Sequence, residues 1–198
     1  MRIILASKSP RRRQLLGELF SDFEIITAET DETMPDGVPL REAVAIIAER
    51  KGRAVLNSVS KSERGVVDDC LIIASDTMVE AGGYPLGKPK DDSDAYRMLR
   101  LLSGRAHNVH TGIAVFYRGS FVRSVASTRV YFKDLSDEQI SAYIKTGEPM
   151  DKAGAYGIQG EAGMFVEKIE GDFDTVVGLS KDLTRTLVDQ IIEKTKLK

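Results

Sequence analysis

The sequence has few of the residues that build disulfide, zinc or nucleophile sites. Among its 198 residues are one cysteine (Cys70), two histidines (His107 and His110) and no tryptophan. A single cysteine excludes a disulfide framework within the chain and is typical of a reducing compartment; in its apolar run we expect Cys70 to be buried and inert. The histidines do not make a complete zinc site, so we expect them in structural or hydrogen-bonding roles.

A basic excess and long apolar runs are lacking as well. The 28 lysines and arginines are balanced by 30 aspartates and glutamates, which argues against a general nucleic-acid-binding protein. No apolar run approaches the ~20 residues that cross a membrane, and the N-terminal apolar stretch is too short for a signal peptide. We therefore expect a cytoplasmic protein without a nucleic-acid or membrane partner.

Strand and helix patterns alternate along the chain without a repeat, which predicts an α/β architecture with a mixed sheet. No low-complexity linker divides the sequence, so residues 1–198 are expected to form one domain. The expected strands cover residues 3–6, 23–28, 71–79, 109–117, 121–132 and 164–169, the third being interrupted at Ser75-Asp76-Thr77. The expected helices begin near Pro10, Pro39, Asp91, Ser136 and Leu183.

Three arginines, Arg11, Arg12 and Arg13, follow the expected helix cap Ser9. Cations are unfavourable there, because the helix dipole places partial positive charge at this end. A bound anion would explain them, since free backbone N–H groups, the hydroxyls of Ser7 and Ser9, and forked guanidinium groups suit phosphate oxygens. The alternative is a solvated charge run. In either case a helix turns by about 100° per residue, so the three arginines cannot all face one ligand.

Two further charged residues stand in apolar surroundings. Lys51 lies three or four residues from apolar neighbours on both sides; it either carries its ammonium to the edge of the core or directs it towards an anion. Asp76 follows the buried-strand residues 71–74. A carboxylate at a strand end lies where ligands bind in α/β sheets, whereas the alternative is a turn or capping aspartate.

Other charged residues extend this set. With Asp76, the acidic residues Glu29, Asp31 and Glu32 would supply hard oxygen ligands for Mg²⁺ or Mn²⁺. Lys88, in a Gly-Lys-Pro turn, would add a positive charge. The sequence therefore predicts a site at which cations and carboxylates meet a phosphorylated ligand.

Several of these segments occur in the same order in one family. They are Leu5-Ala6-Ser7-Lys8-Ser9-Pro10-Arg11-Arg12, Asp31-Glu32, Lys51, Ala74-Ser75-Asp76-Thr77, Gly87-Lys88-Pro89, Leu102-Ser103-Gly104 with His107 and Thr111, and Glu148-Pro149 through Gly160. On these segments, which run across nearly the whole chain, the sequence resembles the Maf family of nucleotide pyrophosphatases, formerly named septum-formation inhibitors.

The resemblance implies hydrolysis of a nucleoside triphosphate to the monophosphate and pyrophosphate, with Mg²⁺, Mn²⁺ or Co²⁺, by a protein that is often a homodimer. The implied fold is similar to that of the inosine-triphosphate pyrophosphatases: an elongated mixed sheet flanked by helices, with two lobes around a deep cleft. The implied catalytic residues are Asp76, Glu32, Lys51 and Lys88, with Asp76 activating water and both carboxylates at the metal. The implied phosphate-binding residues are Ser7, Ser9, Arg11 and Arg12.

Within the family, the chain resembles the dTTP/UTP pyrophosphatase subgroup at Arg11, Thr77 and Gln159. Gln159 can both donate to and accept from a pyrimidine edge. The implied substrates are dTTP and UTP, or modified pyrimidine nucleotides in a house-cleaning role. Two alternatives stay open: a 7-methyl-GTP pyrophosphatase of the same family, and a nucleotide-binding regulator of cell division that hydrolyses nothing.

Overall fold

The computed structural model describes residues 1–62 and 69–196. The chain divides into two compact units, each formed by segments that are distant in the sequence. Unit 1 comprises Met1–Asp76, Thr111–Ala126 and Gly178–Lys198, and unit 2 comprises Thr77–His110 and Ser127–Val177. Three strands have residues in both units: β3 (Cys70–Ala81), β5 (Ala106–Tyr117) and β6 (Ser120–Phe132).

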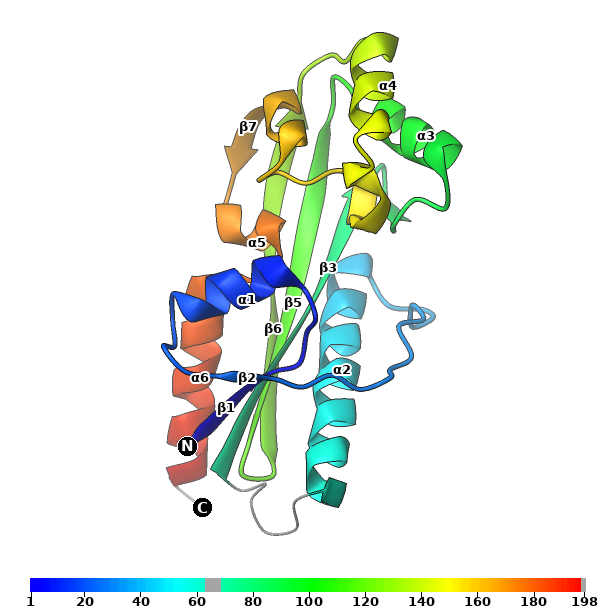
Figure 1. Cartoon of the computed structure of the whole chain (residues 1–198). Coiled ribbons are helices and arrows are strands. Elements are labelled where there is room, and N and C mark those ends of the chain that lie inside the picture. Colours follow the sequence, from blue (N-terminus) through cyan, green and yellow to red (C-terminus); the bar gives the residue numbers. More distant parts are fainter. Residues whose placement is uncertain (63–68, 197–198) are drawn as a thin grey trace. The chain divides into compact units, whose positions relative to one another are not determined.

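In the described part of unit 1, the strands that lie wholly within it are β1 (Arg2–Leu5) and β2 (Glu24–Ile25), and the α-helices are α1 (Pro10–Gly17), α2 (Leu40–Ser62) and α6 (Lys181–Lys196). Strand β1 pairs in parallel with both β2 and β3, so that Ile4 lies between Glu24 and Ile72. Figure 1 shows α2 and α6 on opposite sides of the strands of this unit. Apolar residues of α2, among them Ala48 and Val55, pack against one face of these strands.

Unit 2 is built around the other ends of β3, β5 and β6. Its own elements are β4 (Tyr84–Leu86), α3 (Asp92–Leu102), α4 (Asp137–Lys145), the 3₁₀ turns η2 (Glu148–Asp151), η3 (Ala153–Ala155) and η4 (Glu161–Phe165), β7 (Val166–Glu170) and α5 (Phe173–Val177). Strand β4 runs antiparallel to β3, and β7 runs antiparallel to β6. The core of the unit includes the buried side chains of Leu99, Phe132, Tyr156 and Phe165.

Within the described residues the sheet has seven strands in the order β2-β1-β3-β5-β6-β7, with β4 paired to β3. Its parallel and antiparallel pairs, flanked by helices, confirm the predicted α/β class with a mixed sheet. None of the described helices is both long enough and apolar enough to span a membrane.

Local signals in the sequence place several element ends correctly. The hydroxyl of Ser9 accepts from the backbone N–H of Arg12 at the start of α1, and Ser136 forms the predicted capping box with Gln139 at the start of α4. The predicted hairpin of β5 and β6 turns at Arg118 and Gly119, which have φ angles of 46° and 67°. Such positive φ values at both central residues suit a tight hairpin.

Three strand predictions are wrong in detail. Strand β3 runs without interruption from Cys70 to Ala81. Strand β2 is only the pair Glu24–Ile25, and β7 begins at Val166 because the residues before it form the 3₁₀ turn η4. Apolar composition suggested longer or shifted strands, but the available strand partners set these bounds.

Candidate active site

The turn between β1 and α1 places a serine hydroxyl at the carboxyl end of β1. Strand β1 ends at Leu5, and the backbone N–H of Ala6 still bonds to the carbonyl of Ile73 on β3 (2.8 Å). Ser7 follows; it is buried, and its Oγ accepts from the N–H of Ser9 (3.2 Å). The hydroxyl of Ser9 caps α1, so of the two predicted serines Ser9 already serves the helix.

The side chain of Arg12 is fixed by backbone carbonyls of unit 1. Its Nε donates to the carbonyl of Gly178 (2.9 Å) and its Nη1 to the carbonyl of Ser75 (2.7 Å), while Nη1 also approaches Ser7 Oγ (3.4 Å). The buried hydroxyl of Ser75 donates to the same Gly178 carbonyl (2.9 Å). The guanidinium is thus held in one orientation beside Asp76.

Burial lowers the pKa of Arg12 from its usual value, and the negative charges of Asp76 and Glu32 act in the opposite direction. An arginine stays protonated despite such a shift. Arg12 therefore brings a fixed, weakly hydrated positive charge to this end of β1.

Lys51 on α2 links two carboxylates. Its Nζ lies 2.7 Å from Asp76 Oδ1 and 2.8 Å from Glu32 Oε2. The side chains of Lys51 and Asp76 are only 16% and 15% exposed, whereas that of Glu32 is 62% exposed. The ammonium of Lys51 is therefore directed at two acidic groups, one largely buried and one exposed to solvent.

Asp76 lies within β3, and the prediction that it ends a strand is wrong. Strand β3 continues beyond it because Val79 to Ala81 pair with β4. The last β3 residue in register with β1 is Ile73, so Asp76 still lies past the end of its parallel neighbour. Ligands commonly bind at such carboxyl ends in α/β sheets.

The wider acidic set predicted around Asp76 is not assembled. The carboxylate of Asp31 accepts from the N–H of Thr33 (2.9 Å) and pairs with Arg50 (3.6 Å), and Glu29 is exposed to solvent. Within residues 1–62 and 69–196, no three or more His, Cys, Asp or Glu side chains gather in a group that could hold a metal ion. The donor set is therefore the pair of carboxylates, Glu32 and Asp76, that share Lys51.

Two carboxylates suit a divalent cation that is held together with a ligand. Mg²⁺ usually keeps several waters and binds one or two carboxylates plus substrate phosphates, in contrast to an all-protein cage. Glu32 and Asp76 meet this requirement, because both reach the same ammonium nitrogen. The residues present thus fit a cation that phosphate oxygens would share.

Arg11 lies in α1 of unit 1 and is half-buried, whereas Lys88, Thr77 and Gln159 belong to unit 2. Lys88 and Gln159 are exposed, and Thr77 follows Asp76 along β3. The carbonyl of Gly87, next to Lys88, accepts from the N–H of Gly154 (3.0 Å). This bond ties the Gly-Lys-Pro turn to the glycine-rich segment that carries Gln159.

Both histidines make hydrogen bonds inside unit 2, as predicted. His107 Nε2 lies 2.8 Å from the hydroxyl of Tyr156. His110 lies 2.8 Å from both Ser127 Oγ and Glu80 Oε2. Cys70 is buried, also as predicted.

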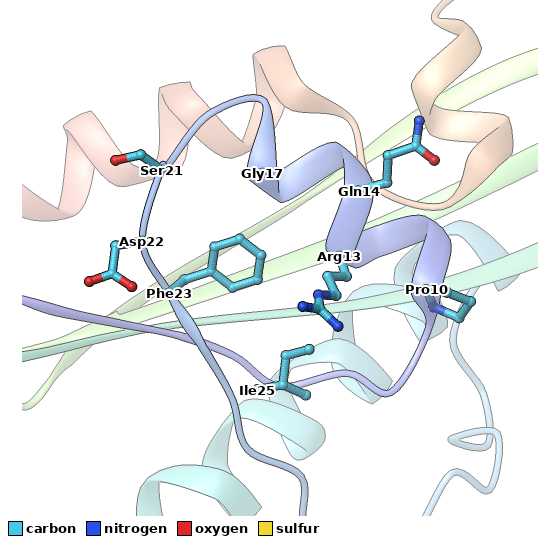
Figure 2. A pocket seen from close by; sticks show the side chains of 8 residues that line it. All are labelled: Pro10, Arg13, Gln14, Gly17, Ser21, Asp22, Phe23 and Ile25. Carbon is cyan, nitrogen blue, oxygen red and sulfur yellow. The ribbon is translucent and has the colours of Figure 1, made fainter.

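Arg13 belongs to a different surface of α1. It lines a hollow of about 580 Å³. Figure 2 shows Arg13 among side chains of α1 and of the segment that follows this helix. The lining residues are Pro10, Arg13, Gln14, Gly17, Ser21, Asp22, Phe23 and Ile25. Arg12 and Arg13 therefore face different surroundings, because successive residues on a helix are rotated by about 100°.

Sequence reasoning missed the two carbonyls that hold Arg12. Backbone groups of Ser75 and Gly178 carry no signal in the sequence beyond their place in the chain. Their partner could be identified only from the folded arrangement, because Gly178 is 166 residues from Arg12.

The site combines fixed positive charges with two carboxylates at the carboxyl end of a strand. This combination is typical of an α/β protein suited to a phosphorylated, metal-bound ligand. Comparison with known proteins gives the particular group. The model of the family described as Maf-like protein matches residues 2–191. The chain belongs to this family, and the resemblance seen in the sequence is confirmed.

Several of its relatives carry the same name. A dTTP/UTP pyrophosphatase of Thermococcus onnurineus is 46% identical over 91% of this chain and 93% of its own length. The proteins of that name from Bdellovibrio bacteriovorus (43% identity, 95% and 97%) and Pelotomaculum thermopropionicum (47%, 89% and 90%) match similarly. A solved structure of the Ham1 protein of Staphylococcus aureus overlaps 82% of this chain and 90% of its own, with a TM-score of 0.47 and 16% identity.

Proposed function

We propose that this chain is a nucleoside-triphosphate pyrophosphatase that hydrolyses dTTP and UTP to the nucleoside monophosphate and pyrophosphate. The observation that carries the proposal is the group of Lys51, Glu32 and Asp76 beside Arg12. Relatives with 43–47% identity over most of the chain are named dTTP/UTP pyrophosphatases, which supports the choice of substrate.

In this proposal Asp76 is the general base. It takes a proton from a water molecule whose oxygen bonds to the α-phosphorus, while the bond from that phosphorus to the bridging oxygen breaks and pyrophosphate leaves. Lys51 and Arg12 offset the negative charge that develops on the phosphate oxygens. Lys88, Ser7, Ser9 and Arg11 are assigned to phosphate binding as the family resemblance implies.

Glu32 and Asp76 would hold a divalent metal cation, Mg²⁺, Mn²⁺ or Co²⁺. When bound, the cation would neutralise phosphate charge and help to orient the triphosphate. Arg11, Thr77 and Gln159 are assigned to recognition of the base, for which canonical or modified pyrimidine nucleotides are the candidates. We further propose that residues 1–198 act as one Maf-like domain in the cytoplasm and pair as a homodimer, which light scattering of the purified chain tests.

The test measures pyrophosphate release from dTTP, UTP, CTP, ATP, GTP and 7-methyl-GTP, each with Mg²⁺, Mn²⁺ or Co²⁺. We expect dTTP and UTP to be turned over fastest. Asp76→Asn should lower kcat by at least about 100-fold, the lower scale of general-base catalysis. Asp69→Asn is the matched control: it makes the same change just before β3, at an exposed residue paired with the N-terminal amine (3.1 Å).

Other outcomes would contradict parts of the proposal. Fastest turnover of 7-methyl-GTP would move the chain to the other subgroup. Nucleotide binding without release of pyrophosphate would favour a regulator in place of an enzyme. Full activity of Asp76→Asn would remove Asp76 from the mechanism.

A further inference from the structure

Gln159 lies in a tight turn of unit 2. The N–H of Gly160 donates to the carbonyl of Gly157 (3.0 Å), which closes a four-residue turn with Ile158 and Gln159 at its centre. Ile158 packs against the core of the unit, whereas Gln159 is exposed. Among the described residues the Gln159 amide has no hydrogen-bond partner, so the turn presents a free donor and acceptor.

Two side chains outside the turn hold both of its ends. The N–H of Gly157 donates to the hydroxyl of Tyr143 (3.3 Å), and that hydroxyl donates to Glu148 Oε1 (3.0 Å). The other carboxylate oxygen, Glu148 Oε2, accepts from the N–H of Glu161 (3.1 Å). One hydroxyl–carboxylate pair, Tyr143 and Glu148, therefore ties the residue that opens the turn to the residue that follows it.

The turn is built to admit this carboxylate. A Cβ atom at Gly160 would lie 2.1 Å from Glu148 Oε1, and one at Gly157 would lie 3.1 Å from the same oxygen and 2.6 Å from Cε of Lys152. The φ angle of Gly160 is −99°, so its backbone conformation does not require glycine. Close approach of Glu148 does require it.

Tyr143 is itself rigidly placed. Its side chain is buried and meets the ring of Phe165 edge-on, with centroids 5.2 Å apart. Burial raises the pKa of its hydroxyl, so the group keeps its proton and can donate to Glu148. A donor fixed in this way holds the turn before any ligand arrives, which reduces the ordering that binding requires.

We propose that Tyr143 and Glu148 are positioning residues that fix the orientation of the Gln159 amide and thereby the preference for pyrimidines. The inference rests on the proposed function and on the assigned role of Gln159. A fixed turn presents the donor and the acceptor of the amide in one arrangement, which suits the edge of a pyrimidine better than that of a purine. A loosened turn should bind pyrimidines less well and discriminate less against purines.

The experiment compares kcat and KM for UTP and ATP in Tyr143→Phe, Glu148→Ala and Glu148→Gln. Tyr143→Phe and Glu148→Ala should raise KM for UTP about tenfold, the scale of one or two lost hydrogen bonds, with kcat within about twofold of wild type. The UTP:ATP ratio of kcat/KM should fall by a similar factor. Glu148→Gln keeps a carbonyl that can accept from Glu161 and should restore most of the ratio.

Tyr131→Phe is the matched control, because it removes a tyrosine–glutamate hydrogen bond (2.8 Å, to Glu170) from the exposed surface of the same unit. Amide hydrogen exchange supplies a second readout in folded protein. The backbone amides of Gly157 and Glu161 should exchange about tenfold faster in Glu148→Ala than in wild type. Their exchange rates in Tyr131→Phe should equal those of wild type.

An active, pyrimidine-selective wild type whose Tyr143→Phe and Glu148→Ala variants keep its UTP:ATP ratio would overturn the inference. So would unchanged exchange at Gly157 and Glu161. Failure of the proposed function has a different signature: wild type would release no pyrophosphate from UTP or dTTP. In that case calorimetric binding of UMP against AMP replaces the kinetic ratio, and equal selectivity in wild type and Tyr143→Phe would again refute the positioning role.

Discussion

The stability of the chain should depend on pH through one buried histidine. His107 on β5 is 3% exposed, and its ring meets Phe132 (centroids 5.0 Å apart) and Tyr156 edge-on. Its Nε2 bonds to the hydroxyl of Tyr156, while its Nδ1 is buried without a hydrogen-bond partner in the described part of the chain. This burial lowers the pKa of His107 from 6.5 to about 4, because a charged imidazolium would be desolvated.

The size and sign of the effect follow from that shift. Between pH 6.5 and about 4 the unfolded chain binds a proton at His107 that the folded chain does not bind, so protonation favours unfolding there. The stabilising contribution is complete above pH 6.5 and is lost as the pH falls through this window. A shift of about 2.5 pKa units corresponds to about 3 kcal/mol of unfolding free energy.

Urea unfolding of wild type and His107→Asn, followed from about pH 7 to about pH 4, measures the contribution. Acidic residues change stability in both proteins, so the difference between the two curves isolates His107. We expect wild type to lose about 3 kcal/mol more than the variant across the window. In NMR titrations only two histidine ring signals are present, and His110→Asn assigns them. Titration of His107 near pH 6.5, or parallel loss of stability in wild type and His107→Asn, would refute the reasoning.

Three other changes have expected outcomes. Arg12→Lys should lower kcat/KM for UTP about 10- to 100-fold, because a lysine cannot donate to the Ser75 and Gly178 carbonyls and also face phosphate. Unaltered kinetics would show that the forked guanidinium group of Arg12 is dispensable. Gly112→Ala should lower the unfolding free energy by about 1–3 kcal/mol, since its Cβ would lie 2.5 Å from the Val44 carbonyl oxygen, and an unchanged urea midpoint would contradict this packing. Removal of divalent cations with EDTA should abolish pyrophosphate release, and Mg²⁺, Mn²⁺ or Co²⁺ should restore it; activity that persists in EDTA would exclude a metal requirement.

The sequence by itself determined the features that depend on neighbouring residues. Helix caps at Ser9, Asp91 and Ser136 bond to N–H groups three residues further along, and the hairpin at Gly119 depends on two adjacent φ angles. Such short-range geometry follows from residue type, because few backbone conformations satisfy it. The fold class follows in the same way from the alternation of strand and helix patterns.

Strand lengths and the membership of the acidic group were decided by tertiary structure. Strand β3 continues through Asp76 because β4 pairs with its far end. Asp31 pairs with Arg50 and accepts from the N–H of Thr33, which leaves Glu32 as the acidic neighbour of Asp76. Residue type predicted carboxylates in this region but not which of them would meet.

The candidate site likewise depends on contacts between residues far apart in the chain. Lys51 could be singled out as a lysine on an apolar helix face, but its bridge to Asp76 spans 25 residues and exists only when α2 packs on the sheet. Tyr143 and Glu148 hold the turn of Gln159 through the Tyr143 hydroxyl. The periodicity of the sequence does not indicate the hydrogen-bond partners of this buried hydroxyl. Composition and spacing therefore selected most of the charged residues. Packing decided which atoms they reach, because each such bond requires two segments of the chain to be brought within about 3 Å of one another.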